Sequence, residues 1–220
     1  MKNRKILPVH FIPLSFLLAI VLGTLFLKIP FATAAGEHTD FLTALFTATT
    51  SVCVTGLVVV DTYSHWSALG QLIILLLVQI GGLGVVSVAS MIMLIGKRKF
   101  SLGDRILLED SLNIENKRGL LAFLSRVFRG VFLTEGIGAL LYATWFVPRL
   151  GFVRGLWTSI FLSVSAFCNA GMDVMGPNSL MEYSGNGMIL YVTMALIVLG
   201  GLGFVVWFDL IDGIKKSLRQ

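Results

Sequence analysis

Long apolar runs alternate along the chain with short polar connectors, and this alternation predicts its elements. A helix of about 20 residues crosses the hydrocarbon core of a membrane, so runs of that length predict membrane spans. Four such runs are present, covering Ile6–Leu27, Ser67–Ile95, Leu120–Val147 and Met188–Phe208. Two further apolar runs, Phe41–Val60 and Leu156–Phe167, lie between them, and the second is too short to cross.

The pattern occurs twice. The run TATTSVCVTGLVVVDT, from Thr47 to Thr62, is answered by FLSVSAFCNAGMDVMG, from Phe161 to Gly176, so that Gly171 lies 115 residues after Gly56 and Cys168 115 residues after Cys53. The cluster IGGLG at 80–84 returns as LGGLG at 199–203, an offset of 119 residues. An internal repeat governs the reading of the whole chain. We therefore expect two units, residues 1–96 and 119–220, joined by a basic amphipathic linker at 97–118.

Composition places these runs in a membrane. Of the 220 residues 56% are hydrophobic and 13% charged, with a mean hydropathy of +0.88, which predicts an all-α integral membrane protein. The net charge is +5, and the basic residues lie beside the apolar runs. This position favours a role in membrane topology and in contact with anionic lipids over a role in nucleic-acid binding. No nucleophile–base pair, metal-ligand pattern or nucleotide loop points to an enzyme or to a cofactor. We expect Cys53 and Cys168 to be reduced thiols packed behind the loops.

Charge decides whether Phe41–Val60 and Leu156–Met172 cross the membrane. If both dip in and return, the basic N-terminus, linker and tail all lie on the cytoplasmic side, as the positive-inside rule requires. The prediction is four transmembrane helices and two pore half-helices, 40–52 and 156–167, entering from outside, with a cytoplasmic N-terminus. The residues inside are Lys2, Arg4, Lys5, Lys97, Arg98, Lys99, Arg105, Lys117, Arg118, Lys215, Lys216 and Arg219, against Lys28, Arg149 and Arg154 outside.

Re-entrant backbone favours ion conduction. Unpaired peptide groups at membrane depth are tolerated only in protein or along a water-filled path, where their carbonyl oxygens replace the hydration shell of an ion. The two extended stretches are Cys53–Leu57 and Cys168–Met172, each with one glycine. Asp61 and Asp173 follow them and attract cations at the outer mouth; ordinary exposed acids are an equal alternative.

Two further features have structural readings. We expect the glycines at 81–84 and 200–203 to allow close helix packing rather than phosphate binding, because they lie inside apolar runs. Glu135, in the middle of a span, costs about 2.5–3.5 kcal/mol on insertion scales. We expect it to hydrogen-bond another helix or the back of a pore loop; a direct ion or proton site is the alternative.

At SVCVTGLVVVDT, GQLIILLLVQIGGLG and SAFCNAGMDV the chain resembles the Trk/Ktr/HKT potassium transporter superfamily, in particular its KtrB/TrkH-like ion-translocating subunit. The resemblance implies helix–pore loop–helix units around one pore, with Gly56 and Gly171 as filter glycines. It implies that Cys53, Val54, Thr55, Asn169 and Ala170 help to supply ion-coordinating carbonyls. The implied function is uptake of K⁺ across the plasma membrane, with Na⁺ as a coupling or activating ion in some members.

The resemblance also implies partners: a homodimer, and a cytoplasmic nucleotide-binding subunit of the KtrA/TrkA type, for which the linker 97–118 is the expected contact. Family chains have four units and this sequence has two. We expect a fragment of a longer protein, with a two-unit chain that builds the pore from two copies as the alternative. Two other functions stay open: a coupled secondary transporter and a non-conducting assembly subunit.

Overall fold

The regular structure is helical. The computed structural model describes residues 11–36, 38–84, 120–203 and 206–207, which contain no strand and a single isolated bridge, Thr33 with Trp66. The all-α prediction is confirmed for these residues. In chain order the elements are α1 (Phe11–Leu27), η2 (Pro30–Ala32), α2 (Phe41–Val52), α3 (Thr62–His65), α4 (Ala68–Leu83), α7 (Leu120–Leu150), α8 (Phe152–Phe167), η3 (Ser179–Tyr183) and α9 (Gly187–Gly201).

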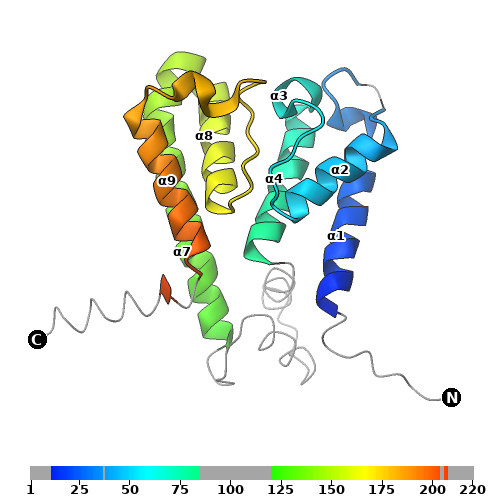
Figure 1. The fold of residues 1–220 in the computed structure, drawn as a ribbon, viewed down its shortest axis with the longest axis horizontal. Coiled ribbons are helices and arrows are strands. Elements are labelled where there is room, and N and C mark those ends of the chain that lie inside the picture. The colour runs from blue at the N-terminus through cyan, green and yellow to red at the C-terminus, as the bar shows by residue number, and fades with distance from the viewer. Residues whose placement is uncertain (1–10, 37, 85–119, 204–205, 208–220) are drawn as a thin grey trace, which may run out of the picture.

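The helices form two groups that stand side by side (Figure 1). In the first group α1 packs on α2 and α4; in the second α7 packs on α8 and α9; α4 contacts α8 across the junction. Each group has the same order: a helix, a second helix that ends in an extended stretch, and a third helix. Buried apolar side chains from both groups form one cluster, so the two groups share a core.

Glycines bring the third helix of each group onto the end of the second. A β-carbon at Gly81 in α4 would overlap the carbonyl oxygen of Val52, the last residue of α2. A β-carbon at Gly200 in α9 would overlap the carbonyl oxygen of Phe167, the last residue of α8. Small residues let helix backbones approach this closely. The prediction that these glycine clusters serve helix packing is confirmed at Gly81 and Gly200.

A second pair of glycines lies on the first helix of each group. Gly23 in α1 and Gly138 in α7 are 115 residues apart, and each faces the other two helices of its group. The side chains that a β-carbon there would meet are Ala48 and Leu77 for Gly23, and Ser163 and Leu196 for Gly138. These contacts repeat at offsets of 115 and 119 residues, the same offsets as the sequence repeat.

The junction between the groups is partly polar. Trp157 in α8 donates its indole N–H to Oε1 of Gln71 in α4 at 2.7 Å, and the Arg154 guanidinium lies 4.5 Å from the centre of the Tyr63 ring. A β-carbon at Gly82 would lie 2.5 Å from Sγ of Cys168, so α4 runs directly against the end of α8. The two groups are therefore held in one register by specific contacts.

Helix bounds differ from the prediction around Pro148. The apolar pattern predicts a span that ends at Val147, but α7 continues through Pro148 to Leu150. A proline in the last turn removes only one helical hydrogen bond, and Gly151, at φ 82°, then turns the chain. As a result α8 begins at Phe152 rather than at Leu156.

Among the described helices one is long and apolar enough, by length and composition, to cross a membrane, at Leu124–Leu150 in α7; five other apolar helices contain 10–17 residues. Residues 1–10, 85–119 and 208–220 lie outside the described residues. The predicted linker 97–118, the basic N-terminus and tail, and parts of three predicted spans fall there.

Candidate functional site

The loop after α2 leaves the helix through a Schellman turn. Cys53 caps the helix, Val54 has a positive φ of 50°, and the N–H of Thr55 donates to the carbonyl oxygen of Thr50 at 3.0 Å. This six-to-one hydrogen bond with a left-handed residue defines the motif. Gly56 follows at φ 75°, and the chain then runs without helix to Val60. Residues 41–60 are thus not one continuous helix.

The loop after α8 follows the same path 115 residues later. Cys168 caps the helix, Asn169 has a φ of 58° and Gly171 a φ of 68°. The N–H of Ala170 donates to the carbonyl oxygen of Ser165 at 2.8 Å. The repeat in the sequence therefore corresponds to a repeat in backbone conformation at the cap, the left-handed residue and the glycine.

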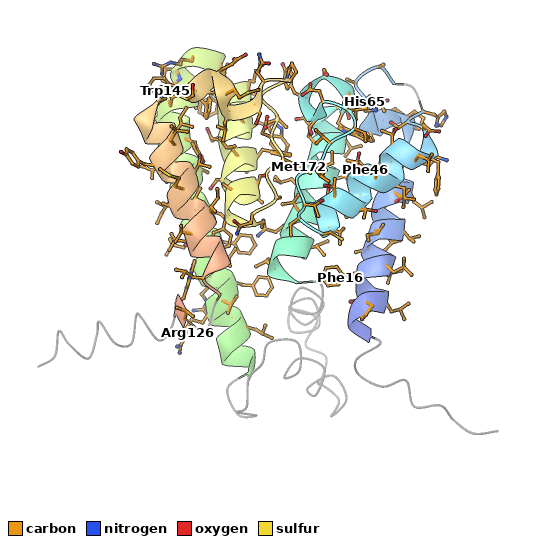
Figure 2. The ribbon with its side chains drawn as sticks, in the orientation of Figure 1. Phe16, Phe46, His65, Arg126, Trp145 and Met172 are labelled. Carbon is orange, nitrogen blue, oxygen red and sulfur yellow. The ribbon has the colours of Figure 1, made fainter. Side chains whose placement is uncertain are left out.

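The two loops meet between the helix groups. A β-carbon at Gly56 would lie 2.5 Å from the carbonyl oxygen of Ala170 and 3.5 Å from Cα of Gly171. Figure 2 shows Met172, the residue after Gly171, between the two groups. Three predicted site residues, Gly56, Ala170 and Gly171, are thus brought together, and the passage between them has no room for a side chain on Gly56.

Two buried hydroxyls brace the loops. Thr50 Oγ1 accepts a hydrogen bond from the N–H of Leu57 at 3.0 Å and lies 2.6 Å from Oγ1 of Thr55. Ser165 Oγ donates to the carbonyl oxygen of Met172. Neither Thr50 nor Ser165 is among the site residues predicted from the sequence. The signal was available, because both carry a hydroxyl and they are 115 residues apart.

A cavity of about 410 Å³ adjoins the loops, and its lining includes Gly56, Gly171, Asp61 and Asp173. Both acids are engaged in local structure. Asp61 caps α3 by accepting from the N–H of Ser64 at 2.8 Å, and Asp173 accepts from the N–H of Met175 at 2.9 Å and from the hydroxyl of Ser179. The two predicted mouth residues do line one cavity, while their carboxylates also hold the turns around it.

The remaining predicted residues have different surroundings. Asn169 donates from its side-chain amide to the carbonyl oxygens of Phe167 and Ile197, both at 3.4 Å. Both cysteines are free thiols, as expected. Cys168 is buried, but Cys53 is exposed, so the expectation that both pack behind the loops was wrong for Cys53. The reason is that α4 covers Cys168 at Gly82, whereas no described helix takes the equivalent place beside Cys53.

The electrostatic setting comes from the helices. α2 and α8 both end at the loops, and the C-terminus of a helix carries a partial negative charge of about half an electron. Their last carbonyl groups therefore create a negative potential around Gly56 and Gly171. The described residues contain no cluster of three or more His, Cys, Asp or Glu side chains that would bind a metal ion.

Glu135 lies in the junction between the two groups. It is buried, and its Oε1 accepts from Nε2 of Gln79 in α4 at 2.9 Å. Its backbone carbonyl accepts from the hydroxyl of Ser163 in α8 at 2.7 Å. The prediction of a structural hydrogen bond to another helix is confirmed.

Comparison with known proteins gives consistent matches over nearly the whole chain. A family model described as TrkH, cation transport protein, matches residues 14–220. The potassium/sodium uptake protein NtpJ of Enterococcus hirae is 40% identical over 96% of this chain and 46% of its own length. The Ktr system potassium uptake protein B of Bacillus subtilis is 36% identical, over 94% of this chain and 47% of its own. The protein of the same name from Vibrio alginolyticus is 32% identical, over 89% and 42%. The chain spans about half the length of these relatives.

Proposed function

The chain belongs to the TrkH family of cation transport proteins, and from this premise we propose that it carries part of the pathway of a potassium-uptake transporter in the cell membrane. The observation that carries the proposal is the meeting of the two loops. Gly56 faces the carbonyl oxygen of Ala170, at a separation that excludes any side chain. Relatives named as potassium uptake proteins support K⁺ as the ion.

The two loops dip into the membrane from outside and return, each between two crossing helices. Extended backbone there needs partners that lipid does not supply, and a dehydrated cation is such a partner. The ends of α2 and α8 add favourable potential for a positive charge. The basic residues near both termini and in 97–118 then lie in the cytoplasm, together with the N-terminus.

The cation-binding segments are Cys53 to Gly56 and Asn169 to Gly171, acting through their carbonyl oxygens. Asp61 and Asp173 line the cavity on the outer side of these segments and raise the local cation concentration. K⁺ enters this cavity, exchanges water for peptide oxygens and moves inward with the membrane potential. The name of one relative includes sodium as well as potassium, which supports Na⁺ as a second ion.

The transporter works as part of an assembly: a homodimer in membrane lipid with a cytoplasmic nucleotide-binding subunit. Relatives named as components of a Ktr system support an assembly of more than one kind of subunit. The segment 97–118 is the proposed contact for that subunit.

The test is substitution of Gly56 in the natural full-length transporter, expressed in cells that lack their own potassium uptake. Gly56→Ser places a β-carbon against Ala170 and forces a left-handed φ on a side-chain-bearing residue, at a cost of about 1–2 kcal/mol. We expect the ratio of initial Rb⁺ to Na⁺ uptake to fall by roughly tenfold or more, since each 1.4 kcal/mol is a factor of ten.

Gly36→Ser is the matched control. Gly36 also has a positive φ, of 70°, but no atom lies within 4 Å of the place of its β-carbon, so uptake ratios should stay at the wild-type value. A well-expressed Gly56→Ser transporter with an unchanged Rb⁺ to Na⁺ ratio would contradict the proposal.

A further inference from the structure

Thr50 and Ser165 hold equivalent places in the two loops. Each lies in the last turn of its helix, 115 residues from the other, and is almost fully buried, with 3% and 1% of its surface exposed. Each reaches across its loop to the residue that follows the glycine, Leu57 after Gly56 and Met172 after Gly171. A hydroxyl at this place is therefore the shared means of closing both loops.

Neighbouring hydroxyls behave differently. Thr49 Oγ1 donates to the carbonyl oxygen of Leu45 at 2.7 Å, and Ser159 Oγ donates to that of Gly155 at 2.7 Å. Bonding to the carbonyl four residues earlier is the ordinary behaviour of serine and threonine in a helix. Thr50 and Ser165 instead direct their hydroxyls to the loop backbone, and this separates them from Thr49 and Ser159.

The two hydroxyls bond to opposite kinds of backbone group: Thr50 accepts from an N–H, and Ser165 donates to a carbonyl oxygen. Thr50 takes the N–H of Leu57 and also contacts the Thr55 hydroxyl, so it holds the residues on both sides of Gly56. Ser165 takes the carbonyl of Met172, which turns that oxygen towards the protein and away from any ion in the passage. Thr50 thereby fixes the peptide group between Gly56 and Leu57, and Ser165 fixes the peptide group between Met172 and Asp173, one peptide beyond Gly171.

We propose that Thr50 and Ser165 are positioning residues for cation selection: they do not touch the ion, but they set the course of the backbone directly after Gly56 and Gly171. This inference rests on the proposed function, because it assigns a role within the same site. A shift of a few tenths of an ångström in the carbonyl oxygens of the two loops alters how well these oxygens replace the water around K⁺ relative to Na⁺.

The experiment measures initial Rb⁺ and Na⁺ uptake by the full-length transporter in potassium-uptake-deficient cells, with the amount of membrane-inserted protein measured in parallel. Thr50→Val and Ser165→Ala remove the hydroxyls. We expect each to lower the Rb⁺ to Na⁺ ratio by about tenfold, the effect of losing one hydrogen bond to a buried backbone group. Thr50→Ser keeps the hydroxyl and should keep the wild-type ratio.

Thr49→Val and Ser159→Ala are the matched controls, since each removes a hydroxyl that bonds only within its own helix. Their ratios should equal that of the wild type. If Thr50→Val or Ser165→Ala does not reach the membrane, Thr50→Cys and Ser165→Cys carry the test, because a thiol fills similar space and hydrogen-bonds weakly.

The outcomes are distinct. A lower Rb⁺ to Na⁺ ratio in the hydroxyl-deleted variants, with rescue in Thr50→Ser, supports the inference. Reduced protein and reduced flux with an unchanged ratio means that the hydroxyls serve stability alone, and overturns it. A wild-type transporter that takes up neither Rb⁺ nor K⁺ overturns the proposed function itself, together with the inference that rests on it.

Discussion

The two loops follow one backbone path with different side chains. Both leave their helix through the same turn, in which the first residue past the cap is left-handed, a place normally taken by glycine and sometimes by asparagine. The second loop has Asn169 there, whereas the first has Val54 at φ 50°. A β-branched residue in this region is a genuine outlier. The first loop therefore stores backbone strain that the second loop avoids.

The surroundings of the two loops also differ. α8 packs on α7 and α9 of its own group and on α4 of the other, and its residues from Phe161 to Phe167 are all buried, whereas α2 packs on α1 and α4 and leaves Leu42 and Phe46 exposed. The loop after α8 is therefore held in place by helices of both groups. The first loop depends more on its own side chains, and this matches its extra contact between Thr50 and Thr55.

The largest difference is expected at the glycines. A β-carbon at Gly56 would lie 2.5 Å from Ala170 O, whereas one at Gly171 would meet only Cα of Gly56, at 3.8 Å. Both substitutions carry the left-handed strain of about 1–2 kcal/mol, but Gly56→Ala adds a steric clash. We expect Gly56→Ala to lower the Rb⁺ to Na⁺ uptake ratio by roughly tenfold or more and Gly171→Ala to lower it less, as measured by tracer influx at matched expression. Equal losses in the two variants would mean that the loops do not meet as described.

A second difference between the two units concerns the hydrogen-bonded pair Gln79 and Glu135 at the junction. The positions equivalent to Gln79 and Glu135 in the other unit, at the repeat offsets of 119 and 115, are Val198 and Ile20. Gln79→Val leaves the buried Glu135 carboxyl without its partner, which should cost about 1–3 kcal/mol of stability. Replacing both groups, as Gln79→Val with Glu135→Ile, should recover most of that loss.

Thermal melting of the purified full-length protein in detergent checks this prediction, with each single variant as the control for the double variant. A double variant that melts lower than Gln79→Val alone would show that Glu135 has a further partner that matters more than Gln79.

The smallest effect is expected from exchanging the turn residues. Val54→Asn places in the first loop the residue that the second loop uses, and should raise stability by about 1 kcal/mol by relieving the left-handed strain. Asn169→Val should lower it by a similar amount or more, because it also removes the hydrogen bond to Ile197. Melting temperatures of the two variants provide the measurement; a shift of the same sign in both would contradict the strain difference.

The repeat made much of this arrangement predictable. The apolar runs indicated the helices, because a long apolar segment is removed from water whatever the exact packing of its side chains. The end of the first half-helix was predicted at Val52 and found there, because Gly56 and the hydroxyl residues make a continued helix unfavourable. The start of α8 was missed by four residues, because a proline near a helix end does not indicate which turn the helix will complete.

Local sequence determined where α2 and α8 stop and that the two loops share one conformation, because turn geometry depends on a few adjacent residues and their allowed dihedral angles. Only the tertiary structure decided which groups face each other: Gly56 with Ala170, Gly82 with Cys168, Gln79 with Glu135. Those pairings depend on the angle and depth at which α4 meets the second group of helices. Such packing is set by many side chains at once, so no single stretch of the sequence records it.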